Sequence, residues 1–164
     1  MGQARELAAA LAGVPIEAVY TSPLARAVAT AEAIATEHGL IPIEVAELRE
    51  IDLGEVEGLA FEQYPAELQR ELLTRPLAMR FPGGETYGEL RERVCRALAD
   101  IVAANRDQAV AVVTHAGSIR AALSAWLGIA DEAIFRIDQR GAAVNIVDWL
   151  DGVPLVRLVN GAGP

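Results

Sequence analysis

The segment Ala109–Leu123, AVAVVTHAGSIRAAL, constrains this chain more than any other stretch. A compact apolar run, Ala109–Val113, ends at a turn that contains His115 and Gly117, and a helical pattern begins at Ser118. A β-branched run that passes through a glycine-containing turn into a helix predicts a strand–loop–helix unit. In α/β proteins ligands bind at the carboxyl ends of such strands, where a helix amino terminus offers free N–H groups to an anion. His115, whose side chain titrates near neutral pH, lies at that junction.

The rest of the chain alternates between helical and strand patterns. The periodicity predicts helices over residues 3–11, 22–38, 86–105 and 118–127, and a helical stretch over 61–74 that Pro65 interrupts. It predicts strands over 18–21, 43–45, 109–113, 142–150 and 155–159. Asp151-Gly152 is typical of a two-residue hairpin turn. We therefore expect an α/β fold with three α/β/α layers, a mostly parallel central sheet and a C-terminal β-hairpin. The length of 164 residues suits one domain over residues 1–164.

Charge and composition exclude several classes of partner. The formal net charge of −9 argues against nucleic acid and anionic membrane surfaces. No apolar run approaches the length of a membrane span and the amino terminus lacks the features of a signal peptide, so we expect a cytoplasmic protein. No His/Cys cluster has metal-ligand spacing, and we expect neither a metal nor another cofactor. A local group of Arg and His can still bind phosphate inside an acidic protein.

The start of the predicted helix over residues 22–38 contains one residue that breaks a local rule. Ser22 suits the N-cap and Pro23 the first helical position. Arg26 falls in the first turn, where the helix dipole favours anions over cations. Two interpretations are open: Arg26 is a solvated surface residue, or Arg26 and the helix terminus together hold an anion.

An acidic loop separates this helix from the second half of the chain. Residues 46–60 contain five carboxylates and two glycines, which is typical of a solvated loop. The spacing of a calcium-binding loop is absent, which argues against a metal site here. The following segment, Phe61–Phe81, is expected to cover a pocket and to set its specificity.

Four separated stretches match one pattern in order and spacing. They are Thr21-Ser22-Pro23-Leu24-Ala25-Arg26-Ala27, the loop Leu48–Gly58, Pro82-Gly83-Gly84-Glu85-Thr86, and Val112-Val113-Thr114-His115-Ala116-Gly117. Together they resemble the histidine phosphatase (phosphoglycerate mutase-like) superfamily. The form of the acidic loop is most similar to the cofactor-independent phosphatase branch.

The resemblance implies a phosphomonoesterase that acts on a small phosphorylated metabolite through a phosphohistidine intermediate. It identifies His115 as the second histidine, which helps to hold the phosphoryl group, and Glu50 as the acid that protonates the leaving oxygen. It implies that Arg26, Ser22 and the N–H of Ala116 bind phosphate. Catalysis of this kind consists largely of positioning and fixed positive charge, which these residue types supply.

Two further residues are assigned by the same resemblance. Gly84 and Glu85, in the stretch that is similar to the family's Gly-Gly-Glu-Ser segment, are expected at the lid of the substrate pocket. No metal ion takes part in this mechanism.

The attacking histidine of the family lies in an Arg-His-Gly motif that is not found in these 164 residues. The chain contains two histidines, His38 and His115, and neither has that context. Gly2-Gln3-Ala4 resembles the family segment that follows the nucleophile loop. We therefore expect the first central strand and its nucleophile to be missing, either because the given sequence starts late or because the member is degenerate. A missing strand would leave a sheet edge open, and a homodimer is one way of covering it.

Three alternatives to a phosphatase remain at this point. The first is a non-catalytic protein that keeps the fold and a phosphate-binding pocket, and the second is a phosphoglycerate mutase-type activity. The third, a serine hydrolase centred on Ser118, is disfavoured because Ala116 and Arg120 occupy the two glycine positions of the Gly-x-Ser-x-Gly elbow.

Overall fold

The computed structural model describes residues 2–163 of the chain. The helices are α1 (Gly2–Leu11), α2 (Ala25–His38), α3 (Ala66–Thr74), α4 (Tyr87–Ala104) and α5 (Ala116–Leu127). The strands are β1 (Ile16–Thr21), β2 (Ile43–Glu44), β3 (Ala109–Val113), β4 (Val144–Leu150) and β5 (Val153–Gly161). Over the described residues, no helix combines the length and the apolar character needed to cross a membrane.

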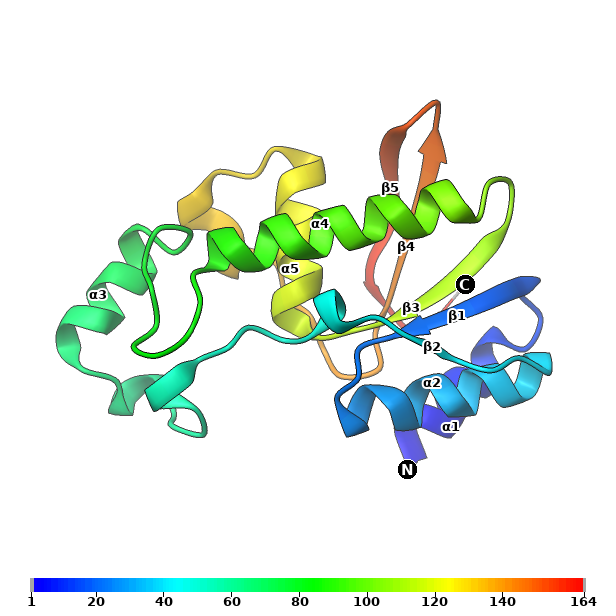
Figure 1. Cartoon of the computed structure of the whole chain (residues 1–164), viewed down its shortest axis with the longest axis horizontal. Coiled ribbons are helices and arrows are strands. Elements are labelled where there is room, and N and C mark those ends of the chain that lie inside the picture. Colours follow the sequence, from blue (N-terminus) through cyan, green and yellow to red (C-terminus); the bar gives the residue numbers. More distant parts are fainter. Residues whose placement is uncertain (1, 164) are drawn as a thin grey trace.

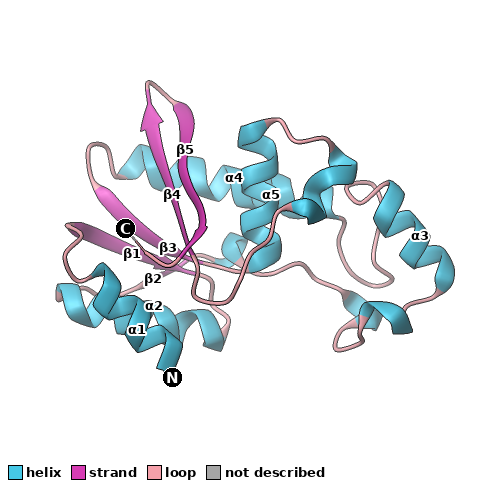
Figure 2. Ribbon diagram, turned by 180° about the vertical axis from the view of Figure 1, so that it is seen from behind, coloured by secondary structure: helices cyan, strands magenta, loops and turns pink. Residues whose placement is uncertain are grey.

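The strands form two separate sheets. Strands β2, β1 and β3 make a parallel sheet in that order, and β4 pairs with β5 as an antiparallel hairpin beside it (Figure 2). Asp151 and Gly152, both with positive φ, form the hairpin turn as expected. In the register of β1 with β3, Thr21 lies opposite Val113, so the two strands end side by side. The expected α/β class, parallel sheet and terminal hairpin are confirmed.

Helices cover both faces of the parallel sheet (Figure 1). Ala111 and Val113 of β3 pack with the apolar faces of α1 and α2, whereas Val110 and Val112 pack with α4. Successive side chains of a strand point to opposite faces, so the apolar run Ala109–Val113 supplies both cores at once. The second edge of β3 pairs with no strand among residues 2–163.

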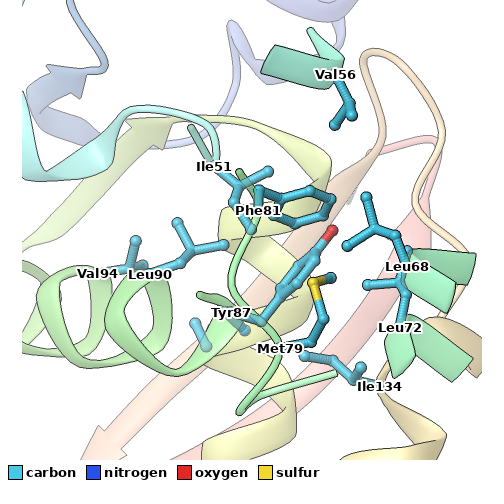
Figure 3. Packing of buried hydrophobic residues seen from close by; sticks show 12 residues of the cluster. Ile51, Val56, Leu68, Leu72, Met79, Phe81, Tyr87, Leu90, Val94 and Ile134 are labelled. Carbon is cyan, nitrogen blue, oxygen red and sulfur yellow. The ribbon is translucent and has the colours of Figure 1, made fainter. Parts of the chain in front are cut away.

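A third apolar core joins α3, α4 and α5 with the connecting loops. Leu90 and Val94 of α4 are fully buried in it, and Leu68 and Leu72 of α3 approach from the opposite side (Figure 3). Pro65 separates a short 3₁₀ turn, Phe61–Gln63, from α3. The predicted interruption of the helical stretch 61–74 at Pro65 is therefore found in the structure, because proline cannot donate the backbone hydrogen bond that a continuous helix needs.

Two helix starts differ from the sequence-based expectation. Helix α2 begins at Ala25, after Ser22-Pro23, and Leu24 occupies its N-cap without a side-chain bond. Helix α5 begins at Ala116, two residues before Ser118, and His115 occupies its N-cap. The serine expected at each helix start bonds to a distant group instead: Ser22 to the His115 ring and Ser118 to the carbonyl of Arg49. Tertiary contacts therefore override the local preference. The predicted capping box of Thr86 and Glu89 is confirmed at the start of α4.

Candidate active site

His115 stands where β3 ends and α5 begins. Its backbone is extended, its carbonyl accepts the N–H of Ile119 at 2.9 Å, and its side chain retains only 7% exposure. The preceding residue, Thr114, donates its hydroxyl to the carbonyl of Leu48 at 2.6 Å. This bond ties the end of the strand to the acidic loop, so the imidazole is fixed by two chain segments at once.

The His115 ring has a polar partner on each nitrogen. Arg26 Nε donates to Nδ1 at 3.2 Å, and Nε2 lies 2.7 Å from Ser22 Oγ. A nitrogen that accepts from a guanidinium carries no proton, so Nδ1 is the bare nitrogen and Nε2 carries the hydrogen. The imidazole is therefore neutral, and it donates through Nε2 toward Ser22.

Arg26 and Ser22 reach this ring because β1 and β3 are parallel neighbours. The N–H of Ser22 continues the sheet by donating to the carbonyl of Val113 at 2.9 Å. The Ser22 hydroxyl accepts the N–H of Leu24 at 3.3 Å and faces His115, instead of capping a helix that starts at Pro23. The predicted N-cap role of Ser22 is wrong for this reason, whereas its predicted place beside His115 and Arg26 matches the structure.

The Arg26 guanidinium has free donors. Among ion pairs within residues 2–163, none includes Arg26, and its single hydrogen bond to a described side chain runs from Nε to His115. The two terminal NH₂ groups are available to an external anion. Guanidinium groups bind phosphate oxygens through two parallel donors, which is the geometry that these groups offer.

Glu50 reaches the same helix terminus from the acidic loop. Its Oε2 accepts the N–H of Gly117 at 3.2 Å, and its Oε1 accepts the N–H of Ile51 at 3.0 Å. A Cβ placed on Gly117 would overlap Glu50 Oε1, so a glycine is required for the carboxylate to come this close. The N–H of Ala116, beside it, makes no hydrogen bond to a described group and is one of the orphan donors of a helix start.

Arg93, a residue that the sequence reasoning missed, holds the loop that carries Glu50. Its guanidinium donates to the carbonyl oxygens of Glu47 at 2.5 Å, Arg49 at 2.9 Å and Glu50 at 3.0 Å. The same group forms a two-point ion pair with Glu85, at 2.5 and 3.1 Å. Arg93 follows Glu85 by eight residues and lies about two turns into α4. This spacing was the sequence signal that could have predicted their ion pair.

Gly84 and Glu85 also contact the loop that carries Glu50. Glu85 Oε1 accepts the N–H of Asp52 at 2.9 Å, and the Glu85 backbone N–H donates to the Asp52 carbonyl at 3.0 Å. Gly84 packs so closely on Asp52 that a Cβ would overlap its carbonyl oxygen. The structure places both residues behind the Glu50 loop, and their expected role at the lid of the substrate pocket stays a prediction.

Burial and charge act on the His115 ring in opposite directions. Desolvation lowers the pKa of His115 below its ordinary value of 6.5, and the nearby cations Arg26 and Arg93 lower it further. The Glu50 carboxylate opposes them by raising this pKa. The net direction is downward, which agrees with the neutral ring that the hydrogen bonds require.

NMR titration of the imidazole checks this balance. We expect a pKa for His115 below 6.5, a higher pKa in Arg26→Ala, where a cation and a donor to Nδ1 are lost, and a lower pKa in Glu50→Gln. The His38→Gln variant assigns the two imidazole resonances. Shifts of the same sign in Arg26→Ala and Glu50→Gln would contradict the arrangement.

No group of three or more His, Cys, Asp or Glu side chains within residues 2–163 could hold a metal ion. The donor set that does converge consists of one neutral imidazole, one guanidinium, one hydroxyl and the free N–H of Ala116 at the helix start. Such a set binds an oxyanion rather than a cation.

The comparison with protein families agrees with this chemistry. The sequence model of the family described as "Histidine phosphatase superfamily (branch 1)" matches residues 1–161. The chain belongs to the histidine phosphatase superfamily. This confirms the resemblance that the four sequence stretches carried, and it supports phosphoryl transfer at the level of the family.

Individual members of the superfamily include mutases and phosphatases. The chain is 30% identical over 148 residues to a 2,3-bisphosphoglycerate-dependent phosphoglycerate mutase of Thermoplasma acidophilum, covering 90% of this chain and 71% of the mutase. It is 33% identical over 131 residues to phosphoserine phosphatase 1 of Hydrogenobacter thermophilus, covering 77% of this chain and 62% of the relative. Mycobacterial relatives at 34% identity are longer, and the chain spans 42% of their length.

A solved structure of this superfamily has the same fold. YhfR of Bacillus stearothermophilus aligns with a TM-score of 0.88 at 26% identity, over 97% of this chain and 81% of that one.

Proposed function

We propose that the chain forms the phosphate-binding and acid half of a phosphomonoesterase site for a small phosphorylated metabolite. The observation that carries the proposal is the convergence of His115, Arg26 and Ser22 within hydrogen-bond distance at the start of α5, with Glu50 bonded to the same helix terminus. Three separate chain segments supply these groups, and each of them follows a strand of the parallel sheet.

The phosphoryl group would replace the contacts that these residues now make with one another. Arg26 turns its free NH₂ groups to two phosphoryl oxygens, and His115 transfers its Nε2 hydrogen bond from Ser22 to a third. The N–H of Ala116 donates to the same group. Fixed donors of this kind are most useful where negative charge is spread over three oxygens in the transition state.

The chemical step needs an attacking histidine that is neither His115 nor His38. His38 is the last residue of α2 and Arg26 lies in its first turn, so about 18 Å of helix separates them at 1.5 Å per residue. A histidine from outside these 164 residues would form the P–N bond while the ester P–O bond breaks. Water then attacks phosphorus, the P–N bond breaks and inorganic phosphate leaves.

Glu50 would handle the proton of each half-reaction. It gives a proton to the leaving ester oxygen in the first step and takes one from the attacking water in the second. Its bonds to the N–H groups of Ile51 and Gly117 fix the carboxylate beside the phosphate site. General acid help of this kind accelerates a reaction by about 10²–10⁴-fold.

A second candidate is a phosphate-binding protein without turnover, since the donors at the start of α5 are enough to bind phosphate. A third candidate is a mutase, which is what the name of the Thermoplasma relative describes. A mutase differs from a phosphatase in the acceptor of the phosphoryl group, which is a second hydroxyl instead of water. The convergence of His115, Arg26 and Ser22 serves all three activities.

Titration of the 164-residue chain with orthophosphate tests the proposal. We expect shifts of the Ala116 and Gly117 amide resonances, and hydrolysis of p-nitrophenyl phosphate that is slow or undetectable, because no nucleophile is present. The His115→Ala variant is the control, since its amide shifts and its hydrolysis rate measure what remains without the imidazole. Rapid hydrolysis that survives His115→Ala would place the chemistry at another site. If the Ala116 and Gly117 amide resonances do not shift when phosphate is added, the chain has no phosphate site at the start of α5.

A further inference from the structure

An apolar pocket of about 420 Å³ adjoins Glu50 on the side of α3. Five of the eight aromatic residues of the chain line it: Phe61, Tyr64, Phe81, Tyr87 and Phe135. Their rings meet in sequence along one arc, with neighbouring centroids 5.0–6.3 Å apart. Figure 3 shows two of these rings, Phe81 and Tyr87, next to each other. Such a concentration of aromatic rings is unusual in a chain that is only 5% aromatic.

The pocket is continuous with the candidate active site. Glu50 and Gly117 line it, and both are bonded to each other at the start of α5. A phosphate ester held by His115 and Arg26 places its leaving oxygen at Glu50. The organic part of the ester must then extend past Glu50, and the aromatic pocket is the space that receives it.

The size and the rim of the pocket indicate an apolar occupant. At about 30 Å³ for each water molecule, the pocket has room for roughly a dozen waters against aromatic faces. A three-carbon leaving group would leave most of that surface hydrated. Leu73 and Phe61 both line the pocket and are exposed, Leu73 to 60%, so both have apolar area that a bulky ligand would cover.

One cation interrupts this apolar lining. Arg120 of α5 donates Nε to the carbonyl of Ile137 at 2.8 Å and belongs to no ion pair between described residues. Its terminal NH₂ groups make no hydrogen bond to the described chain. Glu50 also lines the pocket but forms no ion pair with this guanidinium. A half-buried guanidinium with free donors beside aromatic faces is suited to an acidic group on the ligand.

We propose that this pocket selects phosphate esters of aromatic or similarly bulky apolar alcohols that carry a second acidic group, which pairs with Arg120. The inference rests on the proposed function, because the phosphate must lie at His115 and Arg26. It adds the class of leaving group, which neither the family nor the phosphate site specifies.

Phosphonates test this selection without any need for turnover, since their P–C bond is not hydrolysed. Binding of methylphosphonate, benzylphosphonate and 4-carboxybenzylphosphonate to the full chain is measured by calorimetry at pH 7.5. We expect benzylphosphonate to bind at least tenfold more tightly than methylphosphonate. The added carboxylate should give a further gain of about fivefold or more.

Variants separate the two parts of the pocket. Arg120→Met should remove the gain from the carboxylate and keep the gain from the benzyl group. Leu73→Ser should reduce the benzyl gain, whereas Leu127→Ser, at an exposed leucine of 51% exposure outside the pocket, should not. Both leucines are solvent-exposed at helix ends, so neither change threatens the core.

The outcomes distinguish this inference from the proposed function. Equal affinity for methylphosphonate and benzylphosphonate would overturn the inference and leave the phosphate site standing. Benzyl alcohol that binds as tightly as benzylphosphonate would also overturn it, because the pocket would then act independently of phosphate. Failure of methylphosphonate and orthophosphate to bind at all would overturn the proposed function and this inference with it.

Discussion

Replacing Gly54 with alanine is expected to lower the free energy of unfolding by about 3 kcal/mol. Gly54 has a φ of +54°, which disfavours any residue with a Cβ. The added Cβ would also overlap the carbonyl oxygen of Pro82, so the two loops must separate. That separation breaks the 2.8 Å bond from the N–H of Glu55 to the same carbonyl. Urea denaturation measures the loss.

Gly58 provides a matched control for this substitution. Its φ of +79° is also positive, but a Cβ there would meet no atom within 4 Å. Gly58→Ala should therefore cost only the backbone strain, about 1 kcal/mol. Equal losses for Gly54→Ala and Gly58→Ala would show that the contact with Pro82 does not stabilise the fold.

Replacing Arg26 with alanine is expected to weaken orthophosphate binding by about 10- to 100-fold, the usual worth of a charge-assisted hydrogen bond. The Arg26 guanidinium is the one cation that both contacts His115 and keeps its NH₂ groups free among the described residues. Calorimetry at pH 8 measures the effect under conditions that keep His115 neutral. At lower pH a protonated His115 would offset part of the lost charge.

Two further substitutions separate geometry from net charge. Arg5→Ala removes the same charge from an exposed position on α1 and should leave phosphate affinity almost unchanged. Arg26→Lys keeps the charge without the planar pair of donors, and its affinity should fall between those of the native chain and Arg26→Ala. If Arg5→Ala and Arg26→Ala weaken binding equally, Arg26 acts only through net charge and is not part of the site.

The parts of the site that the sequence predicted are those encoded by short local patterns. The apolar run before His115 predicted a strand that ends at a ligand edge, and an arginine in the first turn of a helix drew attention to Arg26. Four short stretches in a fixed order indicated the family. These features could be found because strand, turn and helix starts depend mainly on neighbouring residues.

Residues that act across the sequence were not predicted. Arg93 holds the Glu50 loop from α4, 43 positions away, and its role appears only when carbonyl oxygens of that loop are placed around it. The aromatic arc gathers residues from Phe61 to Phe135, and nothing in their spacing predicts one pocket. Ser22 was misassigned as a helix cap, because its partner His115 lies 93 positions away.

The sequence by itself determined the fold class, the family and the identity of His115, Arg26 and Glu50 as candidates. The tertiary structure alone decided the tautomer of His115, the clamp on the Glu50 loop and the character of the neighbouring pocket. The physical reason is that hydrogen-bond partners, burial and the loss of hydration depend on which distant segments meet. In this chain the parallel pairing of β1 with β3 and the packing of α4 on the acidic loop make that choice.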